Sequence, residues 1–575
     1  MNQLFRILIG ALFLTSCGEK EGASPENKQP IVTLESERIS VEPFVFKLKA
    51  TVVDDSEQLD YLWELNDQVL DEDGEEIELA LEPEEVHSIH LTVSDGDNQT
   101  EASLDLDLQS KQVIIDLSTT YQTIDGFGGA GPAIPFYFSP DPNRYGKGRG
   151  YWDDAWLDLM IDDWGATIFR DDISPGFEAI EGEYDVDGMT PLFPRDESNN
   201  QIPSTNTFYD GKDTPVGPIG TQLSTKAMYA KGLNEKLQSK GEELKYIMSV
   251  WTPPAWMKTN EDHMKGSLAE EHFGDFADFI RDYLKEFIAL SGVTPYAISI
   301  QNEPNLEHPE WTFGCSYTGD NYNTVLKLVK ERLVADGINV RIMGPETVRF
   351  LERMTTIMDP VFADPVAHTY MDIMATHSYA GDGITIESGS ASEWGQLYDY
   401  SQKGGEKPLW MTETEENGGW EGAFNAGKRI FSALKFGKVS AWLWWSVGAP
   451  DWETNTRNGF TKNGQTSDER PKYWTSKNFY RFIRPGAVQV ASELDHEQVG
   501  VVAFHHPGNE TLTLVFINDS SNDQLIRLTG NEGFENGFKV YQTSEDSNCE
   551  EVAGVSDGGS YIILEANSIY TLQSN

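Results

Sequence analysis

The chain has 575 residues, too many for one ordinary hydrophobic core, so its length predicts roughly two to four domains. Its 94 acidic and 43 basic residues give a formal net charge of −51, and a field of that sign repels nucleic acid and anionic polymers. We therefore exclude nucleic acid as a partner and expect a globular protein that works in an extracellular setting.

A secretory signal and a lipid anchor are predicted at the N-terminus. Residues 1–17 carry a basic Arg6, an apolar run too short to span a bilayer, and small residues before Cys17. The segment LTSC at 14–17 resembles the bacterial lipobox, which implies that Cys17 is lipidated; an ordinary cleaved signal is the alternative. We expect export across the inner membrane, attachment to the outer membrane or cell surface through this lipid alone, and a flexible tether over residues 18–30.

Residues 31–110 predict a small immunoglobulin-like β-sandwich. Apolar and polar residues alternate in short runs such as FKLKA at 46–50 and SIHLTV at 88–93, with turn-rich segments between them. The stretches ATVVDDSEQLDYLWEL and HLTVSDGDNQTEASLDL resemble PKD-like and other immunoglobulin-like modules of bacterial surface enzymes. Because no surface aromatic platform is evident, we interpret this module as a spacer, with glycan binding as the alternative.

Residues 125–483 predict a (β/α)8 TIM barrel. Short apolar strands alternate there with amphipathic helical segments such as Phe276–Gly292 and Tyr322–Gly337, and eight such units fit a closed barrel better than an open sheet. The eight expected strands are Thr123–Ala130, Ala166–Ser174, Leu244–Pro254, Tyr296–Pro304, Arg341–Thr347, Met371–Tyr379, Leu409–Glu415 and Val439–Val447. GFGGAG at 126–131 lacks the acidic partner of a dinucleotide-binding fingerprint, and we interpret it as a tight loop against the substrate.

Residues 484–575 predict a side β-sandwich. Strand-like runs such as VGVVAFHH and LTLVFIND return there without helices between them. Residues 111–124 are expected to add one or more strands to this domain, with Val113–Leu117 as the pairing segment. The predicted fold class is therefore multidomain: a small immunoglobulin-like β-sandwich, then a (β/α)8 barrel with a side β-sandwich.

Candidate functional residues are the polar and aromatic side chains that close the barrel strands, because active sites of such barrels lie at the carboxyl ends of their strands. Two carboxylates brought to one face by non-adjacent strands are what the cleavage of a glycosidic bond requires. The candidates in chain order are Arg170, Asp171, Trp251, Asn302, Glu303, His377, Tyr379, Glu413 and Trp445.

Several motifs resemble glycoside hydrolase family 30 and occur in the order found there. They cover roughly Val113 to the C-terminus and include GFGGAG, VWTPPAWMKTN, SIQNEPN, ATHSY, PLWMTETE and FYRFIRPGA. The resemblance implies a retaining hydrolase in which Glu303 is the general acid/base and Glu413 the nucleophile. It also implies that Asn302 binds the sugar 2-hydroxyl and that Tyr379 hydrogen-bonds the nucleophile.

Chemistry suggests the remaining roles in this site. Glu303 should be protonated near neutral pH beside an anionic nucleophile, and Glu413 should stay ionised beside a donor such as Arg170. Glu415 has the same strand parity as Glu413, and Glu416 follows it, so strand alternation alone leaves both as alternatives.

The aromatic candidates and His377 each have two interpretations. Trp251, Trp256 and Trp445 offer flat faces for sugar rings, with core packing as the alternative, especially for Trp256. His377 is either a donor that faces the ligand or a satisfied core histidine.

No cofactor and no metal are expected, since no histidine pair with ligand spacing occurs at a strand end. With Cys17 assigned to lipid, Cys315 and Cys549 match no redox or metal motif and are expected to be free or structurally buried. We expect a monomer whose partner is a polysaccharide or oligosaccharide.

The segment from QNEP to Cys315 and the FIRPG junction look closest to the xylanase branch of the family, which favours an endo-acting enzyme on a xylan-type polysaccharide. LWWSVGAPDWETNTRNG has acidic residues where that branch can carry a basic glucuronate clamp, and Arg457 comes late, so glucuronate dependence is not expected. A β-1,6-glucanase, a β-1,6-galactanase or an exo-β-glycosidase of the same family is the alternative. A non-catalytic glycan-binding lipoprotein is the alternative from another class, but it would be expected to have lost a carboxylate.

Overall fold

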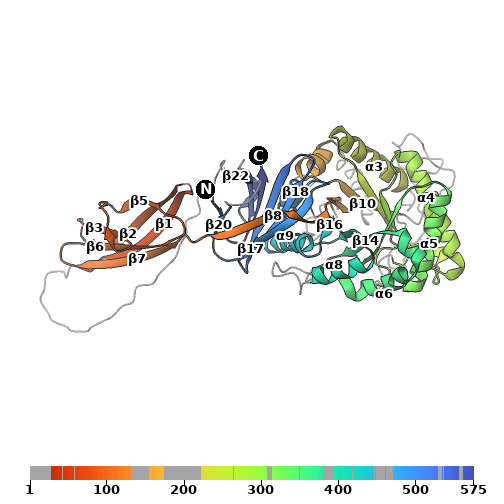
Figure 1. Cartoon of the computed structure of the whole chain (residues 1–575), viewed down its shortest axis with the longest axis horizontal. Helices are drawn as coiled ribbons and strands as arrows, with labels where there is room; N and C mark the ends of the chain where they lie inside the picture. Colours follow the sequence, from red (N-terminus) through yellow and green to blue (C-terminus); the bar gives the residue numbers. More distant parts are fainter. Residues whose placement is uncertain are drawn as a thin grey trace, which may run out of the picture.

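The computed structural model describes residues 28–575 except 42, 57, 131–153, 174–221, 263, 307–313, 349, 380–392, 406, 417–418, 446, 448–459, 461–469, 529–533, 535–536 and 556–560. An N-terminal β-domain, a side β-domain and a barrel ringed by helices follow one another along an elongated molecule (Figure 1). Cys17, the predicted site of the lipid, and Arg457, the arginine considered for a glucuronate clamp, lie outside the described residues. No helix in the described part of the chain is long and apolar enough to cross a membrane.

The N-terminal β-domain consists of two antiparallel sheets packed around one core. Its strands alternate buried and exposed side chains, as in β6, because successive residues of a strand point to opposite faces. The sheet orders are β1-β2-β5 and β4-β3-β6-β7, and both sheets contribute to a core centred on the fully buried Trp63. The strands are β1 Ile31–Val41, β2 Phe44–Val53, β3 Asp60–Leu65, β4 Gln68–Val69, β5 Glu76–Leu81, β6 Val86–Ser94 and β7 Gln99–Asp107.

The barrel closes through eight parallel strands, and each lies within a segment expected from the sequence. The order around the barrel is β9 to β16, with β16 pairing back to β9. The strands are β9 Gly126–Ala130, β10 Ile168–Ile173, β11 Lys245–Val250, β12 Ala297–Ser299, β13 Arg341–Thr347, β14 Met371–His377, β15 Leu409–Glu413 and β16 Val439–Trp445. The predicted fold class, a (β/α)8 barrel with a side β-domain and an N-terminal β-domain, is confirmed.

Amphipathic helices cover the outside of the barrel. In α4 the predicted apolar stripe from Phe276 to Phe287 is buried, and the helix ends at Gly292, whose φ of 68° is the left-handed conformation that glycine adopts readily. The helices of the barrel region are α2 Asp154–Leu157, α3 Gln222–Ser239, α4 Phe273–Ser291, α5 Gly319–Ala335, α6 Phe350–Ala363, α7 Pro365–Tyr370, α8 Glu393–Lys403, α9 Trp420–Lys435 and α10 Pro471–Tyr480.

The glycine-rich segment GFGGA is a barrel strand, and its interpretation as a loop against the substrate was wrong for residues 126–130. All five of its residues are buried in β9. A Cβ atom at Gly128 would lie 1.6 Å from the carbonyl oxygen of Ile168 on the neighbouring strand β10. Glycine is therefore required for the close approach of two backbones.

The side β-domain is one continuous sheet of nine strands that curls around its own core. Strand β8, which precedes the barrel, pairs antiparallel with β17, which follows it, as the sequence predicted. Strands from both edges of the sheet share one cluster of apolar side chains, so the domain forms without a second separate sheet. The strands are β8 Lys111–Thr123, β17 Val488–Leu494, β18 Val499–His506, β19 Thr511–Asn518, β20 Gln524–Arg527, β21 Phe538–Ser544, β22 Ser547–Val555, β23 Tyr561–Leu564 and β24 Ser568–Ser574.

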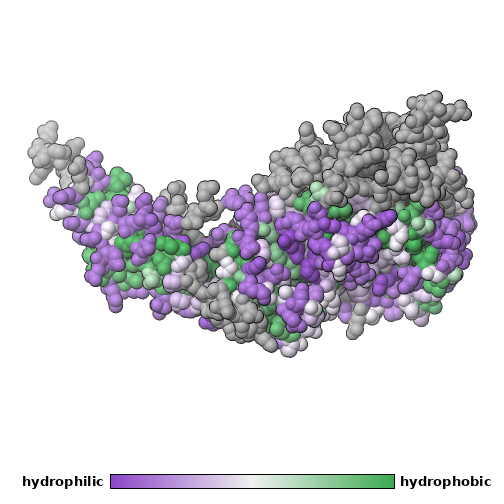
Figure 2. Space-filling view, turned by 90° about the horizontal axis from the view of Figure 1, so that it is seen from above, coloured by the Kyte–Doolittle hydropathy of each residue, from purple (hydrophilic) through white to green (hydrophobic). Residues whose placement is uncertain are grey.

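The N-terminal β-domain is docked onto strands β20 and β23 of the side domain. Leu525 of β20 is 8% exposed and belongs to the core of the N-terminal domain. The rings of Phe44 and Tyr561 meet edge to face with centroids 5.4 Å apart, and Glu84 accepts a hydrogen bond from the Tyr561 hydroxyl at 3.2 Å. These contacts join the two domains through an apolar interface, and Figure 2 shows the N-terminal domain as a lobe that projects from the rest of the molecule.

We predict that Leu525→Ala lowers the free energy of unfolding of the docked N-terminal domain by about 2 kcal/mol, the low end for a buried leucine truncation. Calorimetry of the full chain should show its transition at a lower temperature. Val334→Ala on α5 is the matched control, because this side chain is 63% exposed and should change stability very little. Equal effects of the two variants would contradict the docking of this domain.

Candidate active site

The carboxyl ends of the barrel strands bring most of the predicted site residues together. Arg170 of β10 points into the barrel mouth, whereas its neighbour Asp171 points outward and accepts a hydrogen bond from the Tyr246 hydroxyl at 2.8 Å. The alternation of side chains along a strand explains why only one of these adjacent residues reaches the site. Glu303 lies four residues beyond the end of β12, and Glu413 ends β15.

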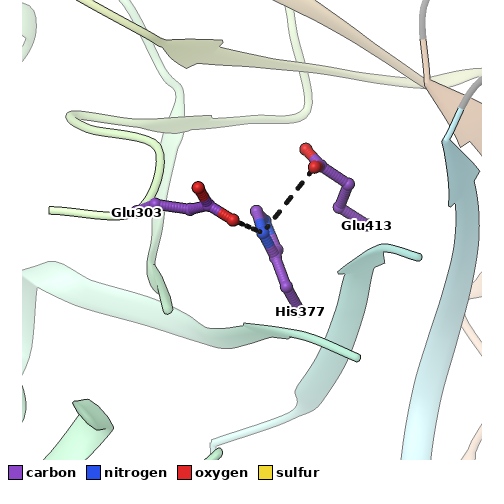
Figure 3. A group of neighbouring side chains, drawn as sticks. All are labelled: Glu303, His377 and Glu413. Carbon is purple, nitrogen blue, oxygen red and sulfur yellow. Dashed lines mark hydrogen bonds and ion pairs between the residues drawn. The ribbon is translucent and has the colours of Figure 1, made fainter. Parts of the chain in front are cut away.

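The two predicted catalytic carboxylates lie on either side of His377. Its Nδ1 atom is 3.0 Å from Oε1 of Glu303 and 4.0 Å from Oε1 of Glu413, and both carboxylates point toward the imidazole (Figure 3). One oxygen of each glutamate and a nitrogen of the histidine lie within 4.8 Å of one another. A retaining glycosidase requires its two carboxyl groups about 5–5.5 Å apart, and this arrangement is of that size.

Arg170 holds the Glu413 carboxylate from inside the barrel. Its Nη1 atom donates to Oε2 of Glu413 at 2.6 Å, and its Nη2 atom donates to Oδ1 of Asn302 at 2.6 Å. The guanidinium also lies 4.6 Å from the centre of the Trp251 ring, a cation–π contact. Tyr379 donates its hydroxyl to the other oxygen of Glu413. Donors on both oxygens fix the direction in which this carboxylate points.

The sequence reasoning missed a further buried carboxylate, that of Glu346 in β13. Its side chain is fully buried, with Oε1 3.0 Å from Nε of Arg170 and 4.0 Å from Nε2 of His377. Burial alone would raise the pKa of Glu346, but the charge of Arg170 lowers it well below its usual range. Glu346 is a polar residue near the end of the fifth strand, so the rule that selected Arg170 and Glu413 would have found it.

The carboxylates around His377 favour the protonated form of its imidazole. Burial alone would lower its pKa, but the carboxylate of Glu413 and the hydrogen bond to Glu303 raise it to about 9. Of its two interpretations, the structure therefore favours a residue of the site that contacts a predicted catalytic carboxylate.

Known glycoside hydrolases are similar to this chain in sequence or in fold. Glucuronoxylanase XynC of Bacillus subtilis (strain 168) is 28% identical over 341 residues, which are 57% of this chain and 73% of XynC. The structure of a GH30 endoxylanase from Clostridium papyrosolvens C71 covers 81% of this chain and 100% of its own, with 23% identity and a TM-score of 0.58. The structure of the endo-β1,6-glucanase BT3312 covers 83% of this chain and 97% of its own, with 16% identity and a TM-score of 0.53. No protein family model matches the chain.

The chain is similar in sequence and fold to members of glycoside hydrolase family 30. It is an O-glycosyl hydrolase of the retaining type, and the spacing of Glu303 and Glu413 agrees with that chemistry.

Two glutamates of this site adopt a backbone conformation that is rare for residues other than glycine. Glu303 has a φ of 49° and Glu346 a φ of 54°. The N–H of Glu303 donates to the carbonyl oxygen of Glu346 at 3.2 Å, so the two strained residues are directly connected. Such conformations cost about 1–3 kcal/mol each and persist where the surrounding structure requires them, typically at functional sites.

Glu413, rather than its acidic neighbours, faces the centre of the site. The Glu416 carboxylate pairs with Nη2 of the buried Arg429 at 2.7 Å instead. Glu413 is the residue of this group that Arg170, Tyr379 and His377 surround.

The tryptophans at the barrel mouth differ in their environments. The rings of Trp251 and Trp445 lie 5.7 Å apart and are partly exposed, so both can offer a face to a sugar ring. Trp256 lies in the short helix Ala255–Met257 with its ring against His272. It is 50% exposed, so the core-packing interpretation of Trp256 was wrong.

Glu303, His377 and Glu413 also present three potential metal-ligand atoms within 4.8 Å. A histidine must lose its proton to bind a metal, and a pKa of about 9 opposes this. The guanidinium of Arg170, 2.6 Å from Glu413, adds a second positive charge against the same carboxylate. This donor set fits proton transfer better than it fits a metal ion.

Both remaining cysteines, Cys315 and Cys549, are free and buried, as predicted. Burial raises the pKa of each thiol to about 12, so neither is a reactive nucleophile at neutral pH.

We predict that Arg170→Met lowers the free energy of unfolding by about 3–5 kcal/mol, because it leaves Glu346 and Glu413 buried without their shared counter-charge. Urea denaturation would measure this loss. Arg332→Ala is the control, because its ion pair with Asp278 is 40% exposed and should contribute at most about 1 kcal/mol. A loss below about 1 kcal/mol for Arg170→Met would contradict a buried, charge-bearing role.

Proposed function

We propose that this protein is an endo-acting glycoside hydrolase that cleaves a xylan-type polysaccharide by double displacement, with Glu413 as nucleophile and Glu303 as general acid/base. The observation that carries the proposal is the approach of these two carboxylates to within reach of a single anomeric carbon. Arg170 and Tyr379 donate to different oxygens of Glu413 and so fix the orientation of this carboxylate.

The reaction then proceeds in two steps. In the first, an oxygen of Glu413 attacks the anomeric carbon while Glu303 gives its proton to the departing glycosidic oxygen. In the second, Glu303 takes a proton from water, and the water oxygen displaces Glu413 from the sugar. Asn302 accepts from Arg170 through its Oδ1 atom, which turns its Nδ2 donors toward the sugar 2-hydroxyl.

The substrate assignment rests on the relatives and on charge. The glucuronoxylanase of Bacillus subtilis and the Clostridium papyrosolvens endoxylanase both support a xylan backbone. A net charge of −51 favours a neutral chain over one rich in glucuronate. The likeness to the endo-β1,6-glucanase BT3312 makes a β-1,6-glucan the second candidate.

We place the enzyme, as a monomer, at the outer membrane or cell surface, attached through Cys17, because residues 1–17 have the pattern of a lipoprotein signal. The N-terminal β-domain then acts as a spacer. Large exposed apolar side chains on its described surface are aliphatic, which gives sugar rings no aromatic platform. They are Ile31, Ile39, Val53, Leu62, Val69 and Val86.

Digestion of defined polysaccharides tests the substrate. We expect a series of oligosaccharides from β-1,4-xylan, no more product from glucuronoxylan than from unbranched xylan, and none from β-1,6-glucan. Release of monosaccharide alone from chain ends would rule out the endo-acting proposal. Glu413→Gln should be inactive on every substrate, and a 2-deoxy-2-fluoroglycoside should form an ester with Glu413 in the native enzyme. An ester on Glu415 or Glu416 would overturn the assignment.

We predict that Glu303→Gln slows cleavage of natural xylan by a factor of at least about 100 but slows aryl glycosides with good leaving groups much less, because these need little protonation. Steady-state kinetics on a series of aryl xylosides would measure the dependence on leaving-group pKa. An equal loss on natural and activated substrates would contradict the general-acid role of Glu303.

A further inference from the structure

The active site contains more buried charges than the two-carboxylate reaction needs. Beneath Glu303 and Glu413 lie Arg170, His377 and Glu346, each with a side chain that is fully buried. Glu346 lies 3.0 Å from Arg170 of β10 and 4.0 Å from His377 of β14. The other polar groups that face it are Ser249 of β11 and Tyr322 of α5.

The proposed mechanism sets the charges that this cluster must hold. Its first step requires Glu413 as an anion and Glu303 as an acid, so with Arg170 and His377 positive and Glu346 negative the cluster is neutral. In the glycosyl-enzyme Glu413 is an uncharged ester and Glu303 has given up its proton. Glu346 and Glu303 now balance the same two cations, and the cluster is neutral again. A buried net charge is costly, so two neutral states favour both halves of the cycle.

We propose that Glu346 is a positioning residue that acts as the fixed counter-charge of the site, which lets one further negative charge alternate between Glu413 and Glu303. The inference rests on the proposed function. Its position supports it, because Glu346 contacts both cations, is removed from water and shares a backbone hydrogen bond with Glu303.

The conformation of Glu346 also supports this role. A left-handed φ at a buried glutamate is unfavourable, and its carboxylate must in addition be removed from water. The charges of Arg170 and His377 compensate for that second cost. A residue that only filled space in the barrel would not require an ionised side chain at this position.

The test is the pH dependence of kcat/KM in Glu346→Gln, which keeps the shape of the side chain and removes its charge. Without this negative charge the cluster holds protons less tightly, so the general acid should lose its proton at a lower pH. The alkaline limb of the pH profile of kcat/KM should therefore shift to lower pH by at least about one unit, and kcat/KM at pH values above that limb should fall about tenfold. Glu346→Asp keeps the charge and should restore most of the wild-type limb. Glu416→Gln, the matched control at the buried pair with Arg429, should leave the limb in place even where it lowers stability.

A folded Glu346→Gln enzyme with the wild-type limb would overturn the inference. If that variant does not fold, the same measurement is made on His377→Asn, which removes a positive charge and should shift the alkaline limb of kcat/KM to higher pH. A limb at the wild-type pH or at a lower pH would contradict the charge balance. The proposed function is judged separately by the ester on Glu413 and by the leaving-group dependence of Glu303→Gln. If both of these hold while the limb of Glu346→Gln stays in place, only the inference about Glu346 fails.

Discussion

The buried guanidinium of Arg170 is the interaction on which the site depends. Its three nitrogens reach Glu346, Glu413 and Asn302 at 3.0, 2.6 and 2.6 Å, so one planar group sets the positions of side chains from β13, β15 and the segment that follows β12. Lysine could not do this, because a single ammonium lacks the rigid fork that aligns several acceptors at once. Removal from water makes each contact stronger and makes the loss of any partner more costly.

Much of the architecture could be predicted because it depends on periodic patterns. The alternation of apolar strands with amphipathic helices located all eight barrel strands, and residue order placed Glu303 and Glu413 at strand ends. GFGGA lies within the first expected strand, yet it was also interpreted as a loop against the substrate, since the sequence could not show that Gly128 touches the backbone of β10. The close contact between β9 and β10 joins residues that are far apart in the sequence, so the local sequence pattern cannot reveal it.

The site was predicted less completely than the barrel for a related reason. The sequence placed Arg170 and Tyr379 beside Glu413, and both contacts are present, but it did not show that Arg170 also contacts Glu346. Glu346 lies next to the last residue of β13 and satisfies the same strand-end rule, but its contacts with Arg170 and His377 come from other strands and no local pattern contains them. For Trp256, residue type favoured the core, whereas its place on a connection after β11 leaves it half exposed.

The pairing of β8 with β17 has a consequence for how the chain folds during synthesis. Strand β8 ends at Thr123 and its partner begins at Val488, so the side domain cannot close until the whole barrel has been made. The N-terminal β-domain takes all its strands from residues 31–107 and can form its sheets early, yet the Leu525 and Tyr561 surface that receives it emerges last. Translation therefore orders the assembly: an early β-domain, then the barrel, and finally a closing sheet that joins the strands on either side of the barrel.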